Sequence, residues 1–279
     1  MNAKSFFLGI TLIFLSTLTY AGGGWVYKQG GGYFKFTQWW AVSPLSYDAN
    51  GRLTNQQPVG YYNTSLYGEY GLSDRLTGIV YTPFFSRTTL FQPDSDPLLP
   101  SASQNGLGDI DLSLKYGLYQ GDKFVVSVTA LWGLPTGRVG TDENSPATGD
   151  GEMNTMLRVD ASTGFGFGGV MGWVNAYAGF NNRTNGFNDE ARFGAEIGFQ
   201  LFNERVLAIG RVDRIDAIGP LDVQSGSIFT NNFEFTTVSA EVGLNITKKI
   251  GVAANVTKAL NARSYFEAPA YSVGIYYNL

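Results

Sequence analysis

Residues 106–137 read GLGDIDLSLKYGLYQGDKFVVSVTALWGLPTG, and this stretch decides the fold class. The first arm alternates apolar side chains with a polar register of Asp109, Asp111, Ser113 and Lys115. After the turn residues Gln120-Gly121-Asp122, the second arm alternates in the same way, with an apolar register of Val126, Val128 and Trp132. A period of two residues is typical of a β-strand whose two faces meet different surroundings. The stretch predicts a hairpin with one apolar and one charged face, but alternation alone does not say which face is inside.

The same period continues along the chain and predicts twelve strands. They are Tyr33–Leu45, Gly60–Gly71, Leu76–Phe85, Gly108–Tyr119, Lys123–Leu134, Asn154–Gly166, Gly169–Phe180, Glu190–Phe202, Val206–Ala217, Asn232–Ile246, Ile250–Leu260 and Ala268–Leu279. Most run 10 to 15 residues. Strands of soluble sheets average about five or six residues, whereas a tilted membrane-spanning strand needs about 9–11.

Long and short connections alternate between these strands. The long ones include residues 48–59, 87–106, 135–152 and 219–230, and the short ones include Ser73-Asp74, Phe167-Gly168 and Asn203-Glu204. Outer-membrane barrels have this asymmetry, with short periplasmic turns and long extracellular loops. We therefore predict an all-β fold, a transmembrane antiparallel up-and-down β-barrel of about 12 strands. Residues 141–152, TDENSPATGDGE, lack the ligand spacing of an EF-hand, so we expect a solvated loop and no metal site.

The N-terminus carries an export signal. Lys4 precedes the apolar run FFLGITLIFLSTL, and Thr19-Tyr20-Ala21 places small residues before the cleavage point. We expect residues 1–21 to be a signal peptide and residues 22–279 to be a single barrel domain. The alternative, a membrane anchor, is disfavoured because the run is short and a Gly-rich stretch follows it.

Composition argues against several classes of function. The chain has no His and no Cys, so the usual Ser-His dyad, thiol chemistry and disulfides are excluded, and we expect neither an enzyme nor a cofactor. The net charge of −4 gives no basic excess, so nucleic acid is not an expected partner.

The apolar face is predicted to point outward. A soluble sandwich would bury that face, but the export signal, the long strands and the aromatic pairs near strand ends, such as Trp39-Trp40 and Tyr276-Tyr277, favour a barrel with its apolar face in lipid. The charged register then lines a lumen inside a backbone wall of roughly 24 Å diameter. The candidate lumen-lining residues are Lys35, Glu69, Asp109, Asp111, Lys115, Arg158, Asp160, Arg192, Glu196, Arg211, Asp213, Glu241 and Lys258. Their near balance of charge is consistent with ion pairs that close the interior, or with a polar permeation path.

Two further features fall on the predicted wall. Pro83 lies inside a predicted strand, where it marks a bulge, a strand end or a lateral opening. The C-terminal GIYYNL, with Gly274, Tyr277 and Leu279, is similar to the assembly signal of outer-membrane barrels, although it ends in Leu rather than an aromatic residue. A plain amphipathic last strand is the alternative.

A family resemblance is carried by Gly106-x-Gly108-Asp109, by LSLKY at 112–116 and by LPTG at 134–137. These motifs, and the preceding hairpin at 61–84, resemble the family called MetA-pathway of phenol degradation, whose members are outer-membrane barrels related to fatty-acid and aromatic-hydrocarbon channels. The resemblance covers roughly residues 60–140 and implies a transport role without catalytic residues.

We expect a channel in the bacterial outer membrane for passive uptake of small, hydrophobic or aromatic molecules. Its expected partners are outer-membrane lipid and the barrel assembly machinery. The alternative is a structural or adhesion barrel with a closed lumen and partner-binding extracellular loops.

Overall fold

The computed structural model describes residues 23–94, 98–140, 145–221 and 232–279, so the predicted signal peptide lies outside the described residues. The described chain forms fourteen strands. They are β1 (Gly32–Tyr47), β2 (Leu53–Ser73), β3 (Leu76–Phe91), β4 (Pro100–Gly106), β5 (Ile110–Gln120), β6 (Phe124–Leu134), β7 (Asn154–Phe167), β8 (Val170–Arg183), β9 (Asp189–Leu201), β10 (Val206–Ile218), β11 (Glu234–Asn245), β12 (Ile250–Arg263), β13 (Tyr265–Phe266) and β14 (Ala270–Asn278).

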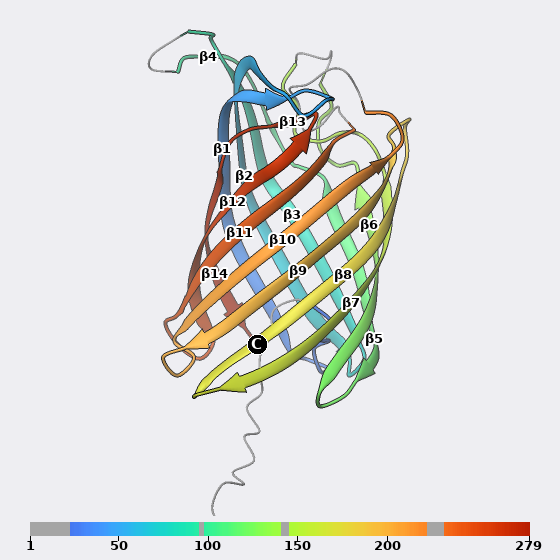
Figure 1. Cartoon of the computed structure of the whole chain (residues 1–279), viewed down its shortest axis with the longest axis vertical. Helices are drawn as coiled ribbons and strands as arrows, with labels where there is room; N and C mark the ends of the chain where they lie inside the picture. Colours follow the sequence, from blue (N-terminus) through green and yellow to red (C-terminus); the bar gives the residue numbers. More distant parts are fainter. Residues whose placement is uncertain (1–22, 95–97, 141–144, 222–231) are drawn as a thin grey trace, which may run out of the picture.

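The sheet closes on itself through the first strand. β1 pairs with β14 on one side and with β2 on the other, and the remaining neighbours follow chain order around the wall, as Figure 1 shows. In the described chain, β4 pairs only with β3 and β13 only with β1, so twelve of the fourteen strands form the wall. The predicted all-β antiparallel barrel of about 12 strands is confirmed.

Several strands are longer than the alternation predicted. β2 begins at Leu53 rather than Gly60, β3 continues to Phe91 rather than Phe85, and β4 lies in a stretch predicted to be a loop. The β3–β4 hairpin rises at one end of the barrel in Figure 1, beyond most of the wall. A strand that leaves the bilayer meets polar surroundings on both faces, so the period of two that identifies membrane strands is absent there.

The β5–β6 hairpin shows which face of the wall points into the barrel. On β5, Leu112 and Leu114 are 43% and 41% exposed on the outer wall, whereas Lys115 is 4% exposed and faces the lumen. Val126, Val128 and Trp132 of β6 share the outward register with them, because Trp132 pairs with Leu112 and Val128 with Tyr116. In a closed barrel an apolar outer wall is the surface that meets lipid. Within the described part of the chain, no helix has the length and hydropathy needed to cross a membrane.

The wall is irregular at Pro83. Thr82 pairs with Leu66 and Phe85 with Thr64, so Pro83 and Phe84 stand opposite the single residue Ser65 in a bulge. β5 pairs with β3 only as far as Tyr81, and β4 takes over as the neighbour of β3 from Ser86. Pro83 is therefore located where one neighbour of β3 is replaced by another.

Candidate functional site: the barrel lumen

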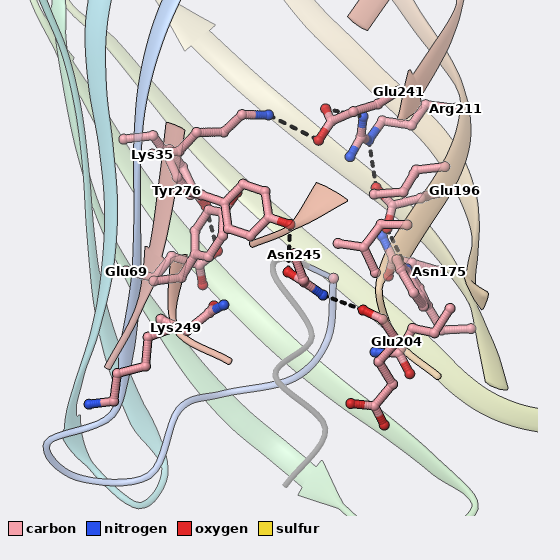
Figure 2. A pocket seen from close by; sticks show the side chains of 18 of the residues that line it. Lys35, Glu69, Asn175, Glu196, Glu204, Arg211, Glu241, Asn245, Lys249 and Tyr276 are labelled. Carbon is pink, nitrogen blue, oxygen red and sulfur yellow. Dashed lines mark hydrogen bonds and ion pairs between the residues drawn. The ribbon is translucent and has the colours of Figure 1, made fainter. Parts of the chain in front are cut away.

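A chain of ion pairs lines one side of the lumen. Lys35 of β1 pairs with Glu241 of β11 at 3.0 Å, and Arg211 of β10 contacts Glu241 at 3.2 Å and Glu196 of β9 at 2.6 Å. The Trp173 indole N–H donates to Glu196 at 2.6 Å and extends the chain to β8. Figure 2 shows the Lys35, Glu241, Arg211 and Glu196 side chains in one continuous line. Lys35 and Glu241 lie on strands separated by β14 and β12, so this pair links parts of the wall that share no backbone hydrogen bonds.

A second pair is fully enclosed. Lys115 Nζ lies 3.1 Å from Glu69 Oε2, and the two side chains are 5% and 0% exposed. The Tyr67 hydroxyl donates to the other carboxylate oxygen of Glu69 at 2.6 Å. A buried carboxylate is tolerated only when donors and an opposite charge surround it, and Glu69 has both.

A third group gathers around Arg158 of β7. Its Nε donates to Asp160 at 2.9 Å, and its guanidinium lies 3.6 Å from the centre of the Tyr177 ring. The Tyr177 hydroxyl donates to Asp213 of β10 at 2.7 Å. The fork of the guanidinium thus contacts a carboxylate while its face covers an aromatic ring.

Residues Gly23–Gly31, here called the N-terminal strap, cross the lumen near the short-turn end. The Gly24 N–H donates to Ser162 Oγ of β7 at 2.7 Å, and the Tyr27 N–H donates to Thr77 Oγ1 of β3 at 3.0 Å. A Cβ atom on Gly24 would lie 3.2 Å from the Val125 and Asp160 carbonyl oxygens and from Ser162 Oγ, so this position has no room for a larger side chain. The strap fills part of the mouth that is periplasmic in barrels of this kind.

Beside the strap is a cavity of about 960 Å³ that opens near the short turns. Its walls combine the paired charges with five aromatic residues, Tyr33, Tyr67, Trp173, Tyr177 and Tyr276. The Tyr276 hydroxyl donates to Asn245 Oδ1 at 2.6 Å, and the Asn245 amide donates to the Glu204 carbonyl, as Figure 2 shows. That bond anchors a turn in which Phe202, Asn203 and Glu204 all have positive φ. Such a conformation is unfavourable for residues other than Gly, so the cavity rim needs this anchor.

The opposite end of the lumen contains an apolar cluster. Its buried members are Ala41, Val59, Tyr61, Phe266, Ala268 and Ala270, and Trp39, Leu90 and Tyr265 pack against them. The Tyr61 and Phe266 rings pack in a tilted arrangement, with centres 5.6 Å apart and planes at 42°. These side chains are enclosed by the barrel, although the lumen of such barrels is usually polar.

A dense charge cluster lies near the same end. Arg183 at the end of β8 forms ion pairs with Glu152 at 2.7 Å, Glu190 at 3.0 Å and Asp150 at 3.1 Å. Arg192 also forms an ion pair with Glu190, with its Nη2 atom 2.6 Å from Glu190 Oε2. Burial raises the pKa of Asp150 to about 6 and outweighs the lowering effect of Arg183. Within the described residues, no group of three or more acidic side chains has a geometry that could hold a metal ion.

The predicted lumen residues fall into three sets. The structure brings most of them together on the inner wall: Lys35, Glu69, Asp111, Lys115, Arg158, Asp160, Arg192, Glu196, Arg211, Asp213 and Glu241. Asp109 precedes β5 and binds the β6–β7 connection instead, accepting the N–H groups of Gly137 at 2.9 Å and Asp150 at 3.1 Å.

The prediction for Lys258 was wrong. Lys258 pairs with Val238 on the outward register of β12, between the exposed side chains of Val256 and Leu260, and its side chain is 55% exposed. It contacts Glu267 at 3.2 Å. A long cationic side chain near a strand end can reach the polar rim in this way.

At the C-terminus, Tyr277 and Leu279 lie on the outer wall and Gly274 pairs with Thr37 of β1. Their role in assembly stays a prediction. The tyrosines of the cavity and Arg183 were missed by the sequence reasoning. The signal for the tyrosines was their register, because Tyr33 and Tyr67 alternate in step with Lys35 and Glu69.

The closed wall, apolar outside and charged within, defines a transmembrane β-barrel of the bacterial outer-membrane type. Solved structures with this fold include the COG4313 outer membrane channel from Pseudomonas putida F1, with 14% identity, a TM-score of 0.61 and coverage of 93% of this chain and 99% of that one. The NanC porin has 8% identity, a TM-score of 0.52 and coverage of 88% and 100%. No family model matches the sequence, and no curated protein matches it.

Proposed function

We propose that this chain is an outer-membrane channel for the passive uptake of small, apolar or aromatic molecules. The observation that carries the proposal is the distribution of side chains in the lumen. Its charges are largely engaged with one another, whereas apolar and aromatic side chains lie at both ends, packed together in the Tyr61–Phe266 cluster and lining the cavity walled by Tyr33 and Tyr276. A charge that is already paired has little left to offer a charged solute, while aromatic faces still gain from contact with an apolar one.

The Pro83 bulge supplies a candidate lateral exit. Pro83 has no N–H, and its carbonyl accepts the Gly108 N–H at 2.8 Å where β5 has already left β3. On this side of β3 the strand pairing is interrupted between Tyr81 and Ser86, so an apolar solute would pass into the bilayer here with little loss of backbone pairing. The Pro83→Val variant tests this step: reduced uptake of apolar solutes supports it, and unchanged uptake rejects it.

We also propose that this chain belongs to the MetA-pathway of phenol degradation family. This membership rests on the motifs at Gly106–Asp109, 112–116 and 134–137. The fold shared with the COG4313 channel is consistent with it.

The channel is tested by conductance and uptake together. Purified barrel in a planar bilayer should conduct small ions beside the strap, and vesicles with lipopolysaccharide in the outer leaflet should admit a small aromatic probe. The Gly210→Ala variant is a matched control, because a Cβ there meets only Ile197 at 3.7 Å.

One observation favours the alternative, a closed barrel whose extracellular loops bind partners. The strap crosses the lumen and is hydrogen-bonded at both of its ends. If conductance and uptake are both absent, and removal of the β3–β4 hairpin abolishes binding to cells or surfaces without preventing assembly, the closed barrel is correct.

A further inference from the structure

Arg183 stands at the centre of contacts from three segments. Its Nε, Nη1 and Nη2 atoms each reach a different carboxylate, on Glu152, Glu190 and Asp150, and its guanidinium lies 4.3 Å from the centre of the Phe187 ring. Its side chain is 5% exposed. We propose that Arg183 is the positioning residue that holds residues 145–153 across the extracellular end of the lumen and thereby controls access to the channel. This inference rests on the proposed function.

Residues 145–153 bridge two distant parts of the wall. Near one end, the Thr88 hydroxyl of β3 donates to the Ala147 carbonyl, and the Thr148 hydroxyl donates to the Leu107 carbonyl at 2.7 Å. At the other end, Asp150 and Glu152 bind Arg183 of β8. In the sheet, β5, β6 and β7 stand between β3 and β8, so the bridge passes three strands.

The charge balance makes Arg183 indispensable to the bridge. Glu152 and Glu190 are 1% exposed at their side chains, and Asp150 is 19% exposed. Arg192 compensates Glu190 only, so without Arg183 the Asp150 and Glu152 carboxylates would have no paired cation among the described residues. Buried carboxylates left without a cation favour a state in which they reach water. These carboxylates reach water with the smallest loss of other contacts when residues 145–153 detach from the wall.

The shape of the guanidinium matters as well as its charge. Three carboxylates from different directions are met by one planar fork with five N–H donors. A Lys side chain has the same charge but is a single point on a flexible stem, so it can approach only part of this set. Arg183→Lys should therefore hold the segment less firmly than Arg183 and more firmly than Arg183→Gln.

The bridge adjoins the irregular part of the wall through its contacts with Leu107 and Asp109. Thr136 Oγ1 donates to the Gly108 carbonyl at 2.7 Å, and Gly108 itself binds the Pro83 carbonyl. Asp109, next to Gly108, accepts the Asp150 N–H. Release of the segment would thus loosen the contacts that adjoin the Pro83 bulge, which connects Arg183 to the proposed passage.

The test uses the absence of cysteine from the chain. Ala147 is 1% exposed, so an Ala147→Cys thiol should react slowly with a membrane-impermeant maleimide applied from outside. Adding Arg183→Gln should raise the labelling rate at least about tenfold, because the segment opens more often. The Arg263→Gln control removes an arginine that is 55% exposed and pairs with Glu234 at 3.3 Å, and it should leave the rate unchanged. Ser103→Cys on exposed β4 should label equally fast in every background.

An unchanged labelling rate in folded Arg183→Gln would overturn the inference. If that variant fails to fold, Asp150→Asn with Glu152→Gln removes the two ion pairs that join Arg183 to residues 145–153, and the loss of these contacts should also accelerate labelling. No acceleration there overturns the inference equally. Uptake of an aromatic probe is measured on the same variants. If Arg183→Gln labels fast but no variant takes up the probe, the role of Arg183 is supported and the proposed channel is rejected. If the probe is taken up but Arg183→Gln labels at an unchanged rate, the channel is supported and the role of Arg183 is rejected.

Discussion

The buried pair of Lys115 and Glu69 gives a quantitative prediction about the lumen. Lys115→Met removes the cation and leaves the fully buried Glu69 carboxylate with the Tyr67 hydroxyl as a neutral donor. Two unit charges 3.1 Å apart attract by about 5 kcal/mol at an effective dielectric constant of about 20, and the cost of burying both ions offsets part of that attraction. Loss of one partner from a buried pair typically costs about 3–5 kcal/mol, so we expect the free energy of unfolding to fall by that amount.

The control is an ion pair of similar length on the outer rim. Lys258→Met removes a contact of 3.2 Å to Glu267, but the lysine is 55% exposed, and exposed pairs contribute about 0–1 kcal/mol. The double variant Lys115→Met with Glu69→Gln removes both buried charges and should regain most of the loss. Urea unfolding in lipid vesicles, followed by tryptophan fluorescence and by heat-modifiable gel mobility, measures all three. If Lys115→Met costs no more than Lys258→Met, the interior is wet and the buried pairing has no energetic role.

Three other changes test separate parts of the barrel. Gly24→Val should displace the strap and increase single-channel conductance, since a Cβ at Gly24 has three atoms at 3.2 Å; unchanged conductance would place the strap outside the ion path. Leu114→Asp should destabilise folding into lipid more than Ser113→Asp, because Leu114 faces the membrane and Ser113 faces the lumen, and the reverse order would invert the two faces. The pKa of Asp150 is raised to about 6, so the folded state holds this proton more tightly than the unfolded state. The penalty of its buried charge, present above that pKa, should decline as pH falls from about 6 toward the ordinary carboxyl value of 3.8. Asp150→Asn should therefore reduce the stability gain on acidification, measured as the shift of the thermal midpoint.

The direction in which each strand side chain points, to the lumen or to the lipid, could be predicted from the sequence. Lys115 and Asp111 could be placed on the inner wall because each strand residue has one of two directions, and Leu112 and Leu114 fix the other one. Lys258 was misplaced because its charge was given more weight than its register, which it shares with Val256 and Leu260. The rule of alternation would have assigned it to the outside.

Contacts between distant segments could not be predicted in the same way. Arg183 finds Asp150 and Glu152 because the β6–β7 connection folds back over the lumen, and nothing in a local period specifies that path. The strap was equally hidden, since Gly24 and Ser162 are 138 positions apart in the chain. Loops and termini inside a barrel are placed by hydrogen bonds to the wall, which become visible only when the wall has closed.

The most direct test of the proposed function compares two solutes of similar size. Vesicles with lipopolysaccharide in the outer leaflet are loaded with the barrel, and the entry of phenol and of a small uncharged sugar is measured against vesicles without protein. Barrel-dependent entry of phenol, exceeding that of the sugar, is the predicted result. Sugar entry that equals or exceeds phenol entry, or no barrel-dependent entry of either solute, would contradict uptake of small apolar or aromatic molecules.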